Sequence, residues 1–271
     1  MLRFLENMQF ALFVFFTAAY AYQIVYLFVG LIGKGRGGRE DAKLHRYAAV
    51  VAARNESAVI ANLIRTLKEQ NYPSELLDIY VIADNCTDNT AQISRQAGAY
   101  VYKRFNKVQV GKGYALEYLF RHIFEDKGET AYDGFFVFDA DNIVDRDFVR
   151  EMNKMFDTGE YTALTSYRNS QNFCANWISA GYALWFLREA KYLNNARYLL
   201  GTSCAVSGTG FMFSREILKS CGGWPFHLLV EDIEFTIHNV VSGEKVGYCP
   251  RAVLYDEQPT KFSQSWKQRM R

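Results

Sequence analysis

The chain begins with an apolar run that no charge interrupts. Between Met8 and Gly33 no residue is charged, and the polar residues Gln9, Thr17 and Gln23 are neutral. A helix needs about 20 apolar residues to cross a bilayer core, whereas the apolar region of a signal peptide is shorter, about 7–15 residues. The pattern therefore predicts a membrane-spanning helix over residues 8–33. A signal peptide and a buried core helix are the alternatives.

Basic residues are distributed unevenly around this run. Only Arg3 precedes it, whereas five basic residues follow it closely: Lys34, Arg36, Arg39, Lys43 and Arg46. The cytoplasmic flanks of membrane helices carry an excess of Lys and Arg. We therefore expect everything after residue 34 to lie in the cytoplasm, at the plasma (inner) membrane. Residues 34–46 are rich in glycine and charge, which is typical of a linker.

After the linker, short apolar strands alternate with amphipathic helices. Strand patterns cover Tyr47–Ala53, Leu77–Asp84, Ala99–Arg104 and Gly134–Asp139. Helical patterns lie between them, first where Ile60, Leu63, Ile64 and Leu67 share one face, then over 85–98 and 111–126. This order predicts an α/β fold with a parallel sheet covered on both faces.

The composition favours a folded protein and argues against a nucleic-acid-binding or disulfide-rich one. The chain has 271 residues, of which 49% are hydrophobic and 22% charged, as in a folded protein. A net charge of +2 is too balanced to make nucleic acid the main partner. The five cysteines are odd in number and form no CxxC pair, so neither a disulfide framework nor a zinc site is indicated.

Charged residues stand at the ends of three of the predicted strands. Arg54 and Glu56 follow the first strand, Asp84 ends the second, and Asp139 and Asp141 end the fourth. Sheets of this class bind ligands at the carboxyl ends of their strands. Converging like charges do not stabilise a sheet, but they suit a site for a cation and a nucleotide. The GxGxxG and GxxxxGK[ST] motifs are absent, which argues against a dinucleotide enzyme or a P-loop NTPase.

The Asp139-x-Asp141 step predicts a metal site. Carboxylate oxygens suit Mg²⁺ or Mn²⁺, which bridge to the oxygens of a diphosphate. The alternative is that Asp141 or Asp145 is only the N-cap of a helix.

Seven segments in chain order carry a resemblance to a known family. They are ARNE (53–56), IADNCTDNT (82–90), VGKGYAL (110–116), DADN (139–142), VSGTGFMF (206–213), LVEDIEFT (229–236) and QRMR (268–271). Together they resemble the motifs of a family-2 glycosyltransferase with the GT-A fold, of the membrane-embedded kind that includes cellulose, chitin and hyaluronan synthases. The resemblance implies a GT-A domain over 47–257, with a Rossmann-like mixed sheet flanked by helices.

The resemblance assigns the acceptor side of the site to the LVEDIEFT segment. It implies Asp232 as the catalytic base, with Glu231 orienting the acceptor or the motif. Val230 stands where the family usually has Thr, outside the two acids. The alternative is that both acids only complement the dipole of a helix that they begin. Trp224, just upstream, is a candidate to stack on the acceptor.

The resemblance assigns the donor side to residues from five other segments. Asp141 would contact the metal, and Asp139 the ribose and the metal shell. The uridine would be held by Arg54, Glu56 and Asp84, and the diphosphate by Lys112, Gln268 and Arg271. The segment over 206–213 resembles the acceptor-side strand instead, and its residues 208–210 would leave room for the sugar, unless they form only a turn. Glu56 has an alternative as an ordinary helix-start acid, and Lys112 as a solvated lysine.

The last residues predict a helix on the membrane surface. Phe262, Trp266 and Met270 are four apart and share one helix face, with basic residues between them. We therefore expect an amphipathic interface helix over 258–271. The Trp that follows the Q-x-x-R step in the family is not in the sequence, so the resemblance implies a longer enzyme that is truncated before its C-terminal membrane helices.

These expectations combine into one functional hypothesis. The chain would carry out an inverting, metal-dependent transfer of a hexose from a UDP-sugar, with UDP-glucose favoured, to a growing polysaccharide, as a processive β-glucan synthase. One alternative is a non-processive transferase that adds one sugar to a lipid or glycan. Alternatives of other classes are a non-catalytic nucleotide-sugar-binding scaffold and a small structural membrane protein.

Overall fold

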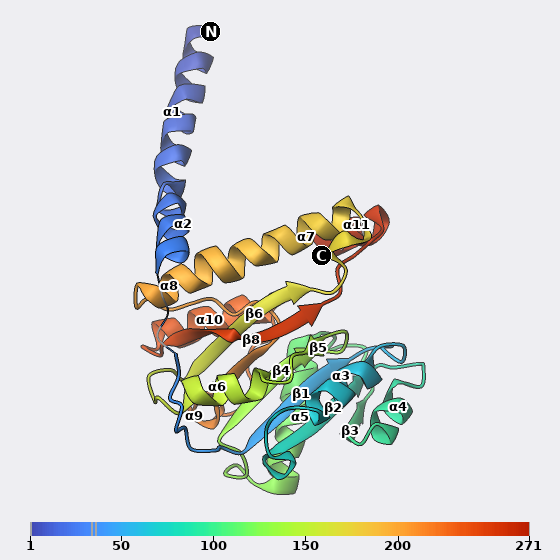
Figure 1. Ribbon diagram of the computed structural model, residues 1–271. Coiled ribbons are helices and arrows are strands. Elements are labelled where there is room, and N and C mark those ends of the chain that lie inside the picture. The colour runs from blue at the N-terminus through green and yellow to red at the C-terminus, as the bar shows by residue number, and fades with distance from the viewer. Residues whose placement is uncertain (1, 34, 36, 271) are drawn as a thin grey trace.

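The computed structural model describes residues 2–33, 35 and 37–270. Figure 1 shows three levels: an N-terminal helix at the top, a layer of helices that includes α7, α8 and α11 beneath it, and a β-sheet flanked by helices at the bottom. The predicted α/β class is confirmed.

The N-terminal apolar run is helical, as predicted, but with different bounds. It forms α1 (Leu2–Tyr20) and α2 (Tyr22–Ile32), with a break at Ala21. Helix α1 begins before Met8 because Leu, Glu and Met in its first turns favour helix. The segment Arg3–Ile32 is long and apolar enough to cross a membrane, and its most apolar stretch of 18 residues contains no buried residue.

The sheet has eight strands in the order β3-β2-β1-β4-β7-β6-β8-β5. The first four in chain order are β1 (Tyr47–Ala53), β2 (Leu77–Asp84), β3 (Tyr100–Arg104) and β4 (Gly134–Asp139), and they are parallel to one another. The others are β5 (Ile143–Val144), β6 (Ala163–Ser170), β7 (Phe211–Ser214) and β8 (Val246–Asp256). Because β7 is antiparallel to both β4 and β6, the sheet is mixed, and its purely parallel part ends at β4.

Helices cover the sheet and form the layer above it. The helices of the lower part are α3 (Ile60–Lys68), α4 (Thr90–Gln96), α5 (Lys112–Lys127), α6 (Phe148–Phe156), α9 (Arg215–Cys221) and α10 (Glu231–Val241). The layer above contains α7 (Trp177–Leu187), a π-helical segment η3 (Arg188–Asn194), α8 (Asn195–Leu199) and α11 (Phe262–Arg269). Short 3-10 turns cover Ser74–Leu76 and Phe173–Ala175.

The helix predicted over 85–98 is wrong in its first part, because residues 85–89 form a loop. Asn85 has a left-handed backbone with φ 52°. The Asp88 carboxylate accepts hydrogen bonds from the backbone N–H groups of Ser57 and Thr90. Such local side-chain bonds compete with helix formation.

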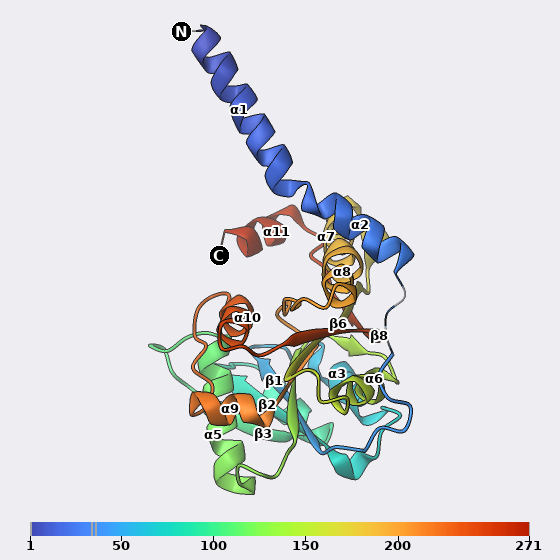
Figure 2. The ribbon, with the colours of Figure 1, turned by 90° about the vertical axis from the view of Figure 1, so that its left-hand side faces the viewer.

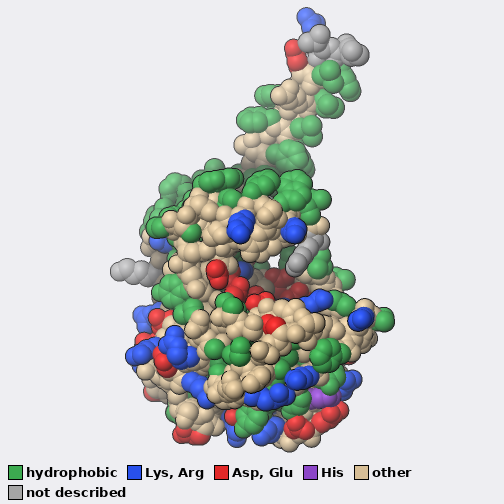
Figure 3. Space-filling view, turned by 90° about the vertical axis from the view of Figure 1, so that its right-hand side faces the viewer, with side chains coloured by type: hydrophobic (Ala, Val, Ile, Leu, Met, Phe, Trp, Pro, Cys, Tyr) green, Lys and Arg blue, Asp and Glu red, His purple; other side chains and the backbone are tan. Residues whose placement is uncertain are grey.

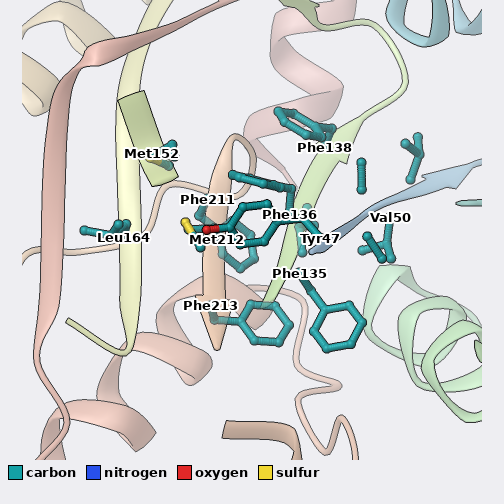
Figure 4. Packing of buried hydrophobic residues seen from close by; sticks show 14 of the residues in the cluster. Tyr47, Val50, Phe135, Phe136, Phe138, Met152, Leu164, Phe211, Met212 and Phe213 are labelled. Carbon is teal, nitrogen blue, oxygen red and sulfur yellow. The ribbon is translucent and has the colours of Figure 1, made fainter. Parts of the chain in front are cut away.

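Strand β4 is buried on both faces, which explains its uninterrupted apolar sequence. Phe135 packs against Phe120 of α5, with ring centroids 5.2 Å apart, while Phe136 and Phe138 point to the other side and contact Phe148 of α6 (Figure 4). A strand covered on both faces carries apolar residues at every position. Its polar residues can therefore appear only where it ends, and there it carries Asp139.

Trp224 belongs to the core and does not stack on an acceptor, so that prediction is wrong. Its side chain is 2% exposed, and its ring lies 5.4–5.5 Å from those of Phe120, Phe213 and Phe235. The contact with Phe235 fixes α10, the helix that begins at Glu231. Trp224 is therefore close to the acidic motif because it packs against the helix that carries the motif.

We expect Trp224→Phe to destabilise the protein by about 1–2 kcal/mol, because it removes buried ring atoms and leaves space behind. No hydrogen bond is lost, since the indole Nε1 has no partner among the described residues. The thermal unfolding midpoint measures this effect. A residue that stacks on the acceptor would instead change the acceptor KM and leave the midpoint unchanged.

Candidate active site

The carboxyl ends of β1, β2 and β4 meet at one edge of the sheet (Figure 1). Two residues in this region have left-handed backbones without being glycine, Asn55 with φ 58° and Asn85 with φ 52°. Their side-chain oxygens accept hydrogen bonds from the backbone N–H groups of Thr87 and Asn106, at 2.8 and 2.9 Å. Such backbone strain persists only where surrounding contacts enforce it, and it concentrates at functional sites.

Lys112, at the start of α5, joins the predicted donor-side and acceptor-side motifs. Its Nζ donates to Asp139 Oδ1 at 2.5 Å and to the Gly208 carbonyl at 2.6 Å, and lies 3.7 Å from Glu231 Oε1. Burial lowers the pKa of Lys112, but the carboxylates of Asp139 and Glu231 outweigh it, and the net pKa lies above the usual value. Lys112 is therefore not a solvated lysine.

Asp141 is a buried acid with acidic neighbours. Burial raises the pKa of Asp141 to about 7, and the nearby charges of Asp256 and Asp139 add to the effect. Within the part of the chain that the structure describes, Asp141 forms no ion pair. A cation bound here would relieve this repulsion.

The alternative that Asp141 is a helix N-cap is wrong. It precedes the short strand β5, and the N-cap of α6 is Asp147. Asp145 has the structural role instead, because its carboxylate accepts a hydrogen bond from the Asp147 backbone N–H at 3.0 Å.

The donor set at Asp139 and Asp141 fits a magnesium or manganese ion that is completed by substrate. In the described residues, no group of three or more His, Cys, Asp or Glu side chains is arranged to hold a metal without help. Mg²⁺ is usually bound by one or two carboxylates together with substrate phosphates and water. Two carboxylates at the sheet edge where the nucleotide is expected match this mode of binding.

The pKa of Asp141 predicts how stability changes with pH. Between the ordinary value of 3.8 and about 7, the folded protein holds a proton that the unfolded chain has released. The stabilisation is therefore fully present at low pH and is lost as the pH rises through about 7. In metal-free buffer, the unfolding midpoint of wild type minus that of Asp141→Asn should fall as the pH rises from about 5.5 to 8. An equal pH response in both proteins would contradict this assignment.

Glu231 and Asp232 begin α10, so the predicted complement to the helix dipole is present. They also face the site. Burial raises the pKa of Glu231. Gly208 has φ 71°, and a Cβ there would lie 3.5 Å from Asp232 Oδ2. The turn at Gly208 therefore lies beside the Asp232 carboxylate. The carbonyl of the same glycine accepts the hydrogen bond from Lys112.

The uridine-binding candidates lie at the same edge of the sheet but differ in accessibility. Asp84 is 5% exposed, and its Oδ1 accepts a hydrogen bond from Arg104 at 2.7 Å. Glu56 is near two acids, and its pKa is raised first by burial and then by Asp139. Arg54 is exposed at the start of the loop that follows β1.

The C-terminal candidates are less well defined. Gln268 is exposed on α11, which lies above α10 in Figure 2. Arg271 lies outside the described residues. Their predicted contact with the diphosphate stays a prediction.

Sequence reasoning missed a second charged group beside Asp232. Arg168 of β6 forms an ion pair with Asp256, and its Nη1 donates to the Ser207 carbonyl at 3.1 Å. Glu189 lies on the π-helical segment η3. Burial raises its pKa, whereas the charge of Arg168 and a hydrogen bond with Ser207 lower it. No strand end or motif marks these residues. Only the fold of η3 and β6 around the 207–210 turn brings them together.

The acidic side chains share an open space. Figure 3 shows Asp and Glu side chains gathered in a hollow between the upper helices and the lower part of the molecule. The site therefore combines an acidic pair suited to a metal, a lysine at a helix start, and a carboxylate facing them across a glycine turn.

Comparisons with known proteins agree on the kind of protein. The model of the family "Glycosyltransferase like family 2" matches residues 45–271. A beta-monoglucosyldiacylglycerol synthase of Synechocystis is 28% identical over 227 residues, which cover 82% of this chain and 46% of that protein. A poly-beta-1,6-N-acetyl-D-glucosamine synthase of Staphylococcus epidermidis is 23% identical over 236 residues, covering 86% and 55%. The chain thus spans about half the length of the curated relatives it matches.

Solved structures share the fold. The mannosyltransferase PcManGT of Pyrobaculum calidifontis, solved with GDP-Man and Mn²⁺, superposes with a TM-score of 0.71 at 19% identity, covering 95% of this chain and 71% of that one. Glucosyl-3-phosphoglycerate synthase of Mycobacterium tuberculosis, solved with Mn²⁺, UDP and phosphoglyceric acid, has a TM-score of 0.54 at 19% identity, covering 82% and 74%.

Proposed function

The chain belongs to glycosyltransferase family 2, and from its site we propose that it transfers a hexose from a UDP-sugar, with UDP-glucose favoured, to a hydroxyl of a membrane-associated acceptor. The observation that carries the proposal is the position of Lys112. Its Nζ donates hydrogen bonds to Asp139 and to the Gly208 carbonyl, and it lies 3.7 Å from Glu231 Oε1. One lysine therefore ties the predicted donor side to the predicted acceptor side.

Asp232 would act as the base. Its carboxylate would accept the proton of the acceptor hydroxyl as the hydroxyl oxygen attacks the anomeric carbon. The bond to the diphosphate oxygen breaks in the same step, and the nucleoside diphosphate leaves. A single displacement without an enzyme nucleophile inverts the anomeric configuration. Gly208 supports this role because it leaves the space beside Asp232 Oδ2 open.

Asp139 and Asp141 would hold Mg²⁺ or Mn²⁺. The bound ion would neutralise negative charge on the departing diphosphate. The carboxylate of Asp139 already accepts a hydrogen bond from Lys112, so the lysine can add a second positive charge on the same side. The raised pKa of Asp141 supports the proposal, because a metal supplies the positive charge that its neighbours do not.

Arg54, Glu56 and Asp84 would hold the uridine at the ends of β1 and β2. The salt bridge to Arg104 orients Asp84 but engages its Oδ1. Among the described residues, its Oδ2 has only a longer contact, 3.3 Å, from the amide of Asn85. We infer that Oδ2 accepts the hydrogen bond from the base.

Two kinds of acceptor fit this site. A growing polysaccharide is the first, as in the relative that makes poly-beta-1,6-N-acetyl-D-glucosamine. A lipid is the second, and it is favoured by the likeness to a synthase of beta-monoglucosyldiacylglycerol. Both place the acceptor at a membrane, where the candidate span Arg3–Ile32 would hold the enzyme.

The test uses washed membranes from cells that express the full chain, so that natural acceptors are present. Radiolabelled UDP-glucose, UDP-N-acetylglucosamine and UDP-galactose are supplied separately with Mn²⁺, and products are separated by chloroform extraction and by size. Label in a long, alkali-insoluble glycan supports the polysaccharide version, and label in a single-sugar lipid supports the lipid version. If no UDP-sugar is consumed above the level of control membranes, the proposed function is wrong.

A further inference from the structure

A buried carboxylate at the end of β8, that of Asp256, has no part in the proposed reaction. Asp256 is 4% exposed, and its Oδ1 accepts a hydrogen bond from the Asn142 side chain at 3.0 Å. Its Oδ2 accepts hydrogen bonds from Nε and Nη2 of Arg168 and from the Gln258 side chain. A buried charge is costly unless it is paired and hydrogen-bonded. Both oxygens of this carboxylate are therefore committed to partners on other parts of the chain.

Asn142 connects the Asp256 carboxylate to the proposed metal motif. Its side chain is fully buried, and its Oδ1 accepts hydrogen bonds from the Asp139 backbone N–H at 3.2 Å and from the Thr209 hydroxyl. The Thr209 hydroxyl oxygen also accepts a hydrogen bond from the Asp139 backbone N–H, at 2.9 Å. The motif that starts at Asp139 is therefore joined to the turn over 207–210, and both are joined to Asp256.

Arg168 connects the same carboxylate to the same turn from the other side. Its Nη1 donates to the Ser207 carbonyl at 3.1 Å, while its Nε donates to Asp256 at 3.0 Å. The ring of Phe186 on α7 lies against the guanidinium, with the ring centre 3.7 Å from Cζ, which is a cation–π contact. The donors of arginine form a rigid planar fork. Contacts with Asp256 and Ser207 at once therefore fix the orientation of the guanidinium and the place of the turn over 207–210.

The turn over 207–210 is held by two cations beside the proposed base. Arg168 and Lys112 donate to the carbonyls of its first two residues, at 3.1 and 2.6 Å. The position of a Cβ at Gly208 lies 3.5 Å from Asp232 Oδ2. A displacement of the turn would therefore change the space next to the Asp232 carboxylate.

We propose that Arg168 and Asp256 form a positioning pair for the transfer reaction. The pair fixes the distance between the metal motif, which it reaches through Asn142, and the turn beside Asp232, which it reaches through Ser207. This distance matters because a displacement of about 1 Å in a reacting group can lower a rate by about 10²-fold. The inference rests on the proposed function, because the rate that it explains is the rate of sugar transfer.

The competing explanation is that the pair only stabilises the contact between β6 and β8, which lie side by side in Figure 1. A buried ion pair is weak evidence for stability, because the cost of desolvation can exceed the Coulombic gain. Replacement of Arg168 by lysine separates the two roles. Lysine keeps a positive charge beside Asp256, but its single ammonium lacks the fork that reaches Asp256 and Ser207 at once.

The test compares wild type with Arg168→Lys, with Asp256→Asn and with the double variant. The control is Arg46→Lys, which makes the same chemical change in a pair at the other end of the sheet. Arg46 lies 3.0 Å from Asp78, at the amino ends of β1 and β2. All the proteins are the full chain, and unfolding midpoints verify that each variant folds.

Two properties are measured for each protein. Amide hydrogen exchange of the purified proteins is followed by mass spectrometry over residues 206–213, which contain the turn, and over 47–53 as a reference. The kcat and the donor KM for sugar transfer are measured in washed membranes. Exchange reports whether the turn is held, and it does so whether or not sugar is transferred.

Arg168→Lys and Asp256→Asn should exchange faster than wild type over 206–213 and like wild type over 47–53. Their kcat should fall by about 10- to 100-fold, and their donor KM should stay near the wild-type value. The double variant should lose little more than either single variant, because both residues act through the same contacts. Arg46→Lys should match wild type in exchange over 206–213 and in kcat.

Wild-type exchange over 206–213 in Arg168→Lys, or wild-type kcat in that variant, would overturn the positioning role and leave the proposed function intact. Faster exchange over 47–53 as well as 206–213, with a lower unfolding midpoint, would show that the pair only supports the fold, and would overturn it too. If wild type itself consumes no UDP-sugar, the proposed function fails and the positioning role fails with it.

Discussion

Replacing Asp232 by asparagine is expected to lower the rate of sugar transfer by about 10²–10⁴-fold, the usual contribution of a general base. The amide has nearly the shape of the carboxylate, but it cannot accept the proton of the acceptor hydroxyl. The backbone N–H of Ile233, which Asp232 Oδ1 now binds at 2.9 Å, can still donate to the amide oxygen. The start of α10 should therefore keep its structure, and the loss should appear in kcat.

The control for this variant is Asp41→Asn, which makes the same chemical change at a side chain that is 88% exposed in the linker. Label transfer in membranes and UDP binding by calorimetry are measured for both proteins. Asp41→Asn should match wild type in both assays, and Asp232→Asn should bind UDP normally. Normal transfer by Asp232→Asn would remove Asp232 from the mechanism, and loss of UDP binding would make it a donor-side residue.

Replacing Asp141 by asparagine should have the second large effect, a fall in transfer of about 10³-fold, which corresponds to about 4 kcal/mol of transition-state stabilisation. The reason is electrostatic. Asp141 is the buried acid whose neighbours are also acidic, so it is the group that gains most from a bound cation. The amide is a weaker ligand and carries no charge, and the departing diphosphate would lose its counter-ion.

The matched control is Asp145→Asn, at the next acid along the chain. Within the described part of the chain, its side chain only accepts a hydrogen bond from the Asp147 backbone N–H, which an amide oxygen can also do. Manganese should raise the unfolding midpoint of wild type and of Asp145→Asn in the presence of UDP, but not that of Asp141→Asn. An unchanged response to manganese in Asp141→Asn would place the metal elsewhere.

The parallel half of the fold could be predicted because each strand there is a buried apolar run that ends in polar residues. The bounds predicted for β1, β2 and β4 agree with the structure, and β3 begins one residue later than predicted. The acids at these strand ends lie at one edge of the sheet for the same reason. Periodicity thus predicted both the framework and the position of Asp139 and Asp141.

The other half depends on contacts between distant segments. Arg168 of β6 pairs with Asp256 of β8, and these two residues are 88 positions apart in sequence. Glu189 reaches the site only because residues 188–194 are wound as a π-helix. Closeness in sequence to Glu231 suggests that Trp224 meets the acceptor, although its ring packs against Phe235 of α10. None of these arrangements follows from local periodicity.

The most direct measurement is the structure of the full chain in lipid nanodiscs with Mn²⁺ and UDP, with the metal located by its anomalous or density signal. The account predicts a metal ion bound by Asp141 and Asp139, with the diphosphate on its far side within reach of Lys112. It also predicts the uracil near Asp84, and Asp232 facing the space where the anomeric carbon would lie. A metal bound away from Asp141, or UDP bound outside the ends of β1, β2 and β4, would contradict the account.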